Sequence, residues 1–90
     1  MVIVAGSLRI APGRRDEFVA ASSPAVVQAR ATPGCLDFVV AADPVDPDRA
    51  VVFERWDSVD ALKAFRGAGP GEDLTALIVE VDVDQYAVVS

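Results

Sequence analysis

Glu54 and Trp56 are the two side chains whose types and spacing best suit chemistry on an aromatic molecule, with Glu54 as the acid–base group and Trp56 as an aromatic wall. Both fall in the stretch Ala50–Trp56, which is rich in β-branched and aromatic residues and predicts a strand. Residues two apart point to the same side of a strand, so one cavity could receive both. Burial beside a large ring would raise the pKa of the Glu54 carboxyl toward the range of a general base. The alternatives are that Glu54 is a structural carboxylate, bonded to the backbone or to an arginine, and that Trp56 only fills the core.

Three apolar side chains from other parts of the chain could form the wall of such a cavity. Phe38 lies in a second predicted strand. Leu62 and Phe65 lie three residues apart, on one face of the helix predicted to follow Trp56. We interpret these three residues as candidate substrate contacts.

The position of Trp56 predicts that its ring borders the cavity. The ring ends a strand just before a helix, and the helix expected to face it offers small residues that leave room: Ala21, Ala25 and Ala29. Tyr86, in the last predicted strand, could donate a hydrogen bond to a substrate oxygen or pack at a contact between subunits.

Other residues with reactive or ligand-binding side chains point to less chemistry. Cys35 has no histidine partner that could generate a thiolate, so we expect a buried, inert thiol. The aspartates of segment 43–49 lack the central glycine and terminal glutamate of an EF-hand loop and predict a solvated turn. The glycine-rich run 67–71 ends a helix and lacks the lysine and the strand–loop–helix context of a phosphate cradle. We therefore expect no metal site.

Hydrophobic periodicity predicts the elements that must position these residues. Gly6 interrupts the first strand. It indicates close approach by a ligand or another backbone or, more simply, a bulge or tight packing. Pro24 should break the first helical region near Ser22 and Ser23. In chain order the expected elements are a strand at 2–10, the broken helix at 14–31, strands at 35–42 and 50–56, a helix capped by Asp57 or Ser58, a short helical turn at 72–77, and a strand within 78–89 that starts near Val81.

This order of elements is that of a ferredoxin-like α+β fold, βαββαβ, with an antiparallel sheet and helices on one face. Leu36, Phe38 and Val40 are expected to share one face of their strand. Most strands are apolar on both faces, so the face without helices also needs a cover. Pairing of two sheets in a homodimer would provide it, with the last strand reaching toward the partner.

Composition limits the classes of function. Ninety residues predict one domain, 1–90, and 52% of them are apolar, which is high for a small monomer. A formal net charge of −6 disfavours nucleic-acid binding, which needs a basic patch. No apolar run is long enough to span a membrane, and no signal peptide is expected. A single cysteine suits a reducing compartment, so we expect a cytoplasmic protein.

The chain resembles the antibiotic biosynthesis monooxygenase domain, a dimeric α+β barrel of ferredoxin-like subunits. Pro-Gly-Cys followed by the Glu-x-Trp strand and a serine-capped helix is fairly specific as a set, whereas no single piece is. The resemblance covers nearly the whole chain, through Pro12-Gly13, Asp16–Phe18, Pro33–Phe38, Asp43, Asp46–Arg49, Val52–Trp56, Ser58, Ala61-Leu62 and Tyr86–Val89.

The resemblance implies one pocket per subunit, between the helices and the concave face of the sheet. Members of the family oxidise polyketide aromatics or quinols without a cofactor, degrade haem, or have no known activity. Trp56 matches the pocket tryptophan of the haem-degrading relatives, but their catalytic asparagine falls on Gly6. Many members carry a histidine where this chain has Phe65, and the chain has no histidine or asparagine at all. We therefore expect no haem and no other cofactor.

Two functions are compatible with these residues. The first is a cofactor-independent monooxygenase that oxidises a quinol-like or polycyclic aromatic small molecule of polyketide type. The second is a non-catalytic dimeric α+β barrel that binds a small apolar ligand. The missing histidine and asparagine favour the second more than the family name suggests.

Overall fold

The computed structural model describes residues 1–66 and 72–89. The predicted helix end and the glycine-rich run at 67–71 lie outside the described residues. Along the chain the elements are β1 (Val2–Ile10), α1 (Arg15–Ala21), α2 (Ser23–Arg30), β2 (Cys35–Ala42), β3 (Arg49–Trp56), α3 (Val59–Arg66), α4 (Glu72–Ala76) and β4 (Ile78–Ala87).

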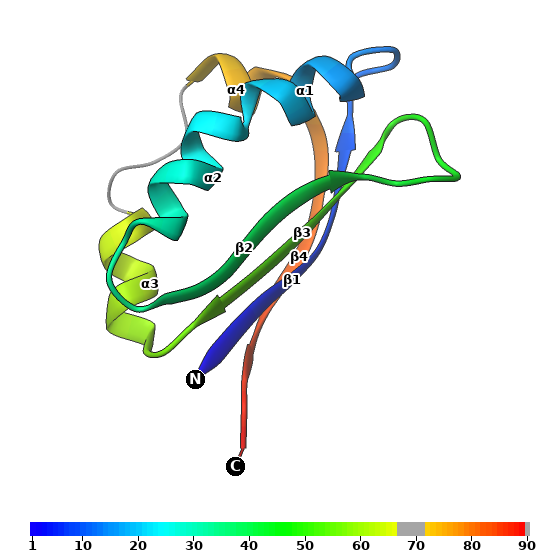
Figure 1. The fold of residues 1–90 in the computed structure, drawn as a ribbon. Coiled ribbons are helices and arrows are strands. Elements are labelled where there is room, and N and C mark those ends of the chain that lie inside the picture. The colour runs from blue at the N-terminus through cyan, green and yellow to red at the C-terminus, as the bar shows by residue number, and fades with distance from the viewer. Residues whose placement is uncertain (67–71, 90) are drawn as a thin grey trace.

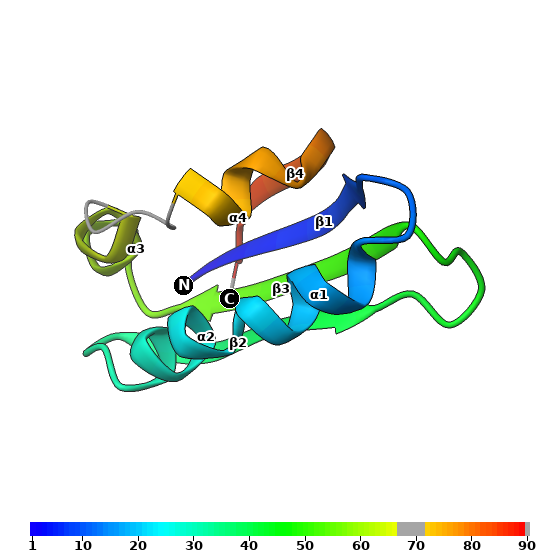
Figure 2. The same cartoon turned by 90° about the horizontal axis from the view of Figure 1, so that it is seen from above.

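The four strands form one sheet in the order β2-β3-β1-β4, and every pair of neighbours is antiparallel. The helices lie on one face of this sheet, with the opposite face left open (Figures 1 and 2). Together, the element order and the sheet order confirm the ferredoxin-like α+β fold. No helix among the described residues is long and apolar enough to cross a membrane.

The first helical region is broken where the sequence predicts. Pro24 occupies the first turn of α2, where its missing N–H costs no intrahelical bond. Ser22 lies between the two helices, and its hydroxyl donates to the carbonyl oxygen of Val19 at 2.6 Å instead of capping α2. The two short helices can therefore follow the curvature of the sheet.

The start of β2 differs from the prediction that Leu36 shares a face with Phe38. The register shifts between Cys35 and Asp37, which is typical of a β-bulge. Cys35 packs against the core, whereas Leu36 is exposed. The bulge brings Asp37 opposite Arg55, with which it forms a salt bridge of 2.7 Å.

The acidic connection between β2 and β3 forms a turn. The Asp43 carboxylate accepts backbone N–H groups from Asp46 and Val45 and a side-chain bond from Arg49, and these hydrogen bonds lower the pKa of Asp43 to about 2. Asp48 accepts the N–H of Gly13, which ties the turn to the loop before α1. These aspartates therefore have structural partners within the fold.

The last strand begins at Ile78, three residues before the predicted start near Val81. The cause is a register shift between Arg9 and Ile10, which lets Ile78 pair with Ile10. The added length of β4 extends the sheet along the edge of β1 beside α4 (Figure 1).

The buried side chains form two clusters on the helix-covered face. One surrounds Trp56 and includes Val4, Phe38 and Leu62. The other contains Leu8, Ile10, Phe18, Ala50, Val52 and Leu77. The side chains that point to this face come from alternate positions of β1 and β3, as the pleat of a strand requires.

Candidate functional site

A cavity of about 300 Å³ lies between the two clusters, under the helices. Its floor comes from the helix-covered face of the sheet, and α1 and α2 contribute one group of wall residues while α3 and α4 contribute another. Most of the lining is apolar, as in sites for small organic molecules. The sheet contributes Val4, Leu8, Phe38, Val40, Val52, Glu54, Ile78, Val81 and Val83, and the helices contribute Phe18, Ala25, Phe65 and Leu74, among others.

Glu54 places a carboxyl group in this cavity. It lies in β3 between Val4 and Phe38 of the neighbouring strands, and only 9% of the residue is exposed. Burial raises the pKa of this carboxyl, while the hydrogen bond from Trp56 and the charge of Arg66 act in the opposite direction. A carboxyl group whose pKa is raised by burial is, once ionised, a stronger base than an ordinary glutamate.

Trp56 does not line the cavity, which corrects the expectation that its ring borders it. The side chain is 0% exposed, and its ring packs against Phe65 with centroids 5.4 Å apart. Its indole Nε1–H donates to Glu54 Oε1 at 3.0 Å. Trp56 therefore donates a hydrogen bond to the carboxyl group that lines the cavity and helps to fix its orientation, without lining the cavity itself.

The three predicted wall residues occupy different places. Phe38 and Phe65 both line the cavity and meet edge to face, with ring centroids 5.5 Å apart. Leu62 is 1% exposed and packs in the Trp56 cluster, so it supports the wall without facing the cavity. Phe65 contacts the Trp56 ring and lines the cavity, whereas Trp56 does not line it. Of the small residues expected to leave room, Ala25 lines the cavity, whereas Ala29 is buried in the core.

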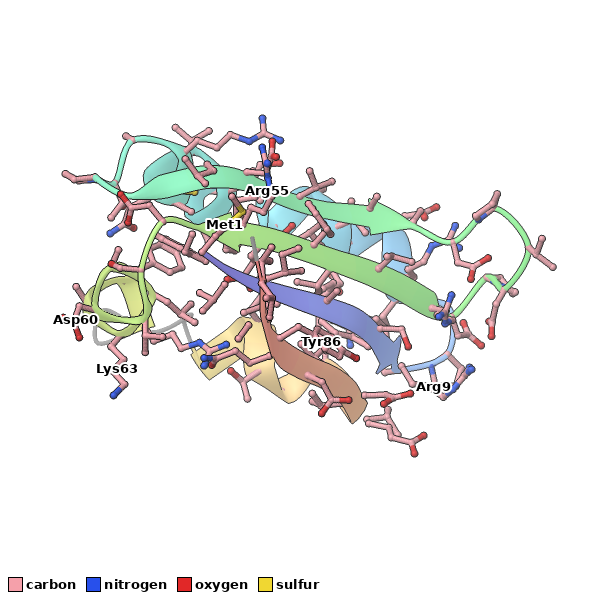
Figure 3. All side chains as sticks on the ribbon, turned by 90° about the horizontal axis from the view of Figure 1, so that it is seen from below. Met1, Arg9, Arg55, Asp60, Lys63 and Tyr86 are labelled. Carbon is pink, nitrogen blue, oxygen red and sulfur yellow. The ribbon has the colours of Figure 1, made fainter. Side chains whose placement is uncertain are left out.

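Gly6 and Tyr86 lie outside the cavity. A Cβ atom on Gly6 would approach the Asp82 carbonyl oxygen to 2.0 Å, so the glycine permits close contact between β1 and β4. This agrees with tight packing, the simpler interpretation of Gly6, with the backbone of β4 as the neighbour. Tyr86 is opposite Ile3 on the helix-free face of the sheet and is 53% exposed (Figure 3). Its hydroxyl therefore cannot reach a molecule in this chain's cavity.

A sequence profile of the antibiotic biosynthesis monooxygenase family matches residues 1–70, which is most of the chain. This chain belongs to the antibiotic biosynthesis monooxygenase family. The resemblance carried by the Pro-Gly-Cys and Glu-x-Trp segments is thereby confirmed.

Solved structures of this family share the fold. A candidate antibiotic biosynthesis monooxygenase from Chloroflexus aurantiacus J-10-fl is 33% identical, with a TM-score of 0.79 over 99% of this chain and 93% of that one. One from Nitrosomonas europaea superposes with a TM-score of 0.85 over the full length of both chains, and at 18% identity it shows the fold alone. The uncharacterized protein sll1783 of Synechocystis is 30% identical over 61 residues, and the match spans 68% of this chain and 42% of that relative's length.

Among the described lining residues, the cavity of this family member holds one ionisable side chain that sequence reasoning did not assign to it. Arg66, the last residue of α3, lines the cavity, and its charge acts on Glu54. A basic residue in the last turn of a helix is common for reasons of helix stability, so its type and position carried no signal of a site.

Metal and thiol chemistry find little support in this family member. Within residues 1–66 and 72–89, no three histidine, cysteine, aspartate or glutamate side chains gather closely enough to hold a metal ion. Burial raises the pKa of the Cys35 thiol, and the charges of Glu54 and Asp37 add to that effect. A thiol with a raised pKa is a poor nucleophile at neutral pH.

Proposed function

We propose that this chain is a cofactor-independent monooxygenase that oxidises a quinol-like or polycyclic aromatic small molecule of polyketide type. The observation that supports this most is Glu54: one buried carboxyl group, with a raised pKa, in a mostly apolar cavity of about 300 Å³. Phe38 and Phe65 offer aromatic edges and faces against which a flat substrate can stack. Membership of the family agrees with this type of reaction.

The chemistry requires a substrate that loses a proton easily and then reduces dioxygen. The Glu54 carboxylate accepts a proton from the substrate, which becomes an electron-rich anion. This anion gives one electron to O₂, and the resulting radical and superoxide combine into a peroxide anion on carbon. The peroxide anion takes the proton back from Glu54 and becomes a hydroperoxide, which restores the carboxylate. For an anthrone, loss of water from the hydroperoxide leaves a quinone, so one oxygen atom enters the product and the other leaves as water. The protein supplies the base, the orientation and a dry site.

A specific observation also favours the second candidate, a non-catalytic barrel that binds an apolar ligand. The Trp56 indole already satisfies Glu54 Oε1, as in a structural buried carboxyl. The sequence lacks the histidine that commonly serves acid–base catalysis near neutral pH.

Oxygen uptake with a panel of anthrones and naphthols separates the two candidates. We expect the protein to consume one molecule of O₂ per anthrone oxidised, at a rate that saturates with substrate. The matched control is Ala25→Trp, because Ala25 is a small, partly buried residue that lines the cavity, and a large ring there would fill it. Uptake by the unmodified chain that does not exceed uptake by this variant would favour the binding protein.

We also propose that the chain forms a homodimer through the helix-free face of the sheet. Figure 3 views this face and shows side chains along all four strands with no helix covering them. Phe53 lies near its centre, opposite Ala5 on one side and Val39 on the other, and is 37% exposed. The apolar members of this face include Ile3, Ala5, Val39, Ala41, Val51, Phe53 and Tyr86. A second sheet packed against them would bury this apolar surface.

Light scattering at micromolar concentration should give twice the mass of one chain. Phe53→Glu should reduce this to the mass of one chain, because it places an unpaired charge in the middle of the proposed contact. Val45→Glu is the matched control, since Val45 is 89% exposed on the turn between β2 and β3. A monomeric mass for the unmodified chain, or a Phe53→Glu variant that still dimerises, would contradict the proposed interface.

A further inference from the structure

The cavity contains two ionisable side chains among its described lining residues, Glu54 and Arg66. Glu54 is buried in the sheet, whereas Arg66 is an exposed residue at the end of α3. The other polar lining residues are Ser22, Gln28 and Thr75, and the Ser22 hydroxyl is bonded to a main-chain oxygen. A molecule inside the cavity would therefore meet an acid at the sheet and a cation at α3.

Arg66 differs from the other arginines in the partners that it has among the described residues. Arg30 donates to the carbonyl oxygen of Phe38, and five further arginines form salt bridges with carboxylates: Arg9, Arg14, Arg15, Arg49 and Arg55. Arg66 forms no ion pair with a described side chain, although its charge reaches Glu54 across the cavity. The Arg66 side chain thus brings to the cavity a positive charge that is not paired with any described carboxylate.

We propose that Arg66 is a specificity-determining residue, which makes the cavity prefer aromatic ligands that carry one negative charge over neutral ligands of the same shape. A guanidinium group next to an apolar wall is less screened than one surrounded by water, so its attraction for an anion is stronger there. The ring system of the ligand would occupy the apolar part of the cavity, and its anionic group would lie at α3. The inference rests on the proposed function only in taking the cavity as the ligand site.

The preference is also compatible with the proposed chemistry. When Glu54 accepts a proton, the substrate left in the cavity is an anion, and a nearby cation stabilises it. Ligands that are already anionic, such as aromatic sulfonates or carboxylates, would use the same charge. Both cases share one recognition chemistry, an aromatic monoanion beside a guanidinium.

A structural role offers a different explanation for Arg66. A positive side chain in the last turn stabilises a helix by interacting with its macrodipole. Lys63 also lies in the last turn of α3 but is exposed and does not line the cavity, and in Figure 3 it extends outward from the helix. Lys63 is therefore a matched control for the loss of one positive charge from this helix.

The test uses two fluorescent probes with the same rings, anilinonaphthalene sulfonate, which is an anion, and the neutral phenylnaphthylamine. Arg66→Met should weaken binding of the sulfonate about tenfold, the size of one lost charge-assisted hydrogen bond, and leave the neutral probe within about twofold. Lys63→Met should change neither affinity. Ala25→Trp should abolish binding of both probes, which places them in the cavity.

Three results would overturn the inference. Equal weakening of both probes by Arg66→Met, or of neither, would show that the guanidinium does not select for charge. The same loss in Lys63→Met would assign the effect to the charge of the helix. Binding of both probes that survives Ala25→Trp would place the preference on another surface. A failure of oxygen uptake while the charge preference persists would instead reject the monooxygenase and leave the role of Arg66 intact.

Discussion

Replacing Trp56 with alanine is expected to lower the free energy of unfolding by about 3–5 kcal/mol, the usual cost of deleting a large ring from a packed core. The side chain is fully buried, contacts the Phe65 ring and belongs to the cluster that joins the sheet to α2 and α3. Alanine would also remove the Nε1–H donor of Glu54 and leave that buried oxygen without its partner. Urea unfolding monitored by circular dichroism measures the loss.

A second variant separates packing from hydrogen bonding. Trp56→Phe keeps an aromatic ring but removes the donor, so it should cost about 1–3 kcal/mol, less than alanine. Because the bond from Trp56 lowers the pKa of Glu54, its loss should raise that pKa further. A cost below about 1 kcal/mol for Trp56→Ala would show that the ring is not packed on all sides, and would restore the expectation that it borders the cavity.

The order of elements could be predicted because each one has a local signal. Alternation marks the strands, Pro24 divides the first helical region, and Ser58 caps α3 by accepting the N–H of Ala61 at 3.1 Å. The alternation of side chains along a strand also predicted that Glu54 and Trp56 share one face, and the burial pattern of β3 confirms it. The bulge at Leu36 had no such signal, since it arises from pairing between β2 and β3.

Depth within the fold could not be predicted in the same way. The alternation of side chains along a strand predicts which face a residue points to. Whether Trp56 borders the cavity depends also on Phe65 of α3, whose ring packs against the Trp56 ring. Tyr86 was a candidate for substrate contact until the pairing of β4 with β1 placed it on the helix-free face. Arg66 became a candidate only when the fold brought the end of α3 to the cavity. These are tertiary properties that a single sequence does not encode locally.

Replacing Glu54 with glutamine should change how stability depends on pH. Burial raises the pKa of this carboxyl in the folded chain, so folding favours its neutral form. Its contribution to stability is therefore fully present below the ordinary pKa of a glutamate and is lost as pH rises through the raised pKa. Glutamine keeps an oxygen for the Trp56 N–H and does not ionise. The stability of Glu54→Gln relative to the unmodified chain should thus increase between acid and neutral pH, as unfolding in urea at several pH values can measure.

The same substitution should have the largest effect on turnover. If Glu54 is the base that takes the proton from the substrate, Glu54→Gln should lower kcat for anthrone oxidation by about 10²–10⁴-fold. The rate of the unmodified chain should rise with pH as the carboxyl ionises, with a midpoint above the ordinary pKa of a glutamate, and the residual rate of the variant should lack this step. Binding of the neutral phenylnaphthylamine should survive in the variant, because the apolar lining is unchanged. Unchanged turnover in Glu54→Gln would show that the buried carboxyl is structural, and the proposal that Glu54 is the base would be rejected even if oxygen uptake persists.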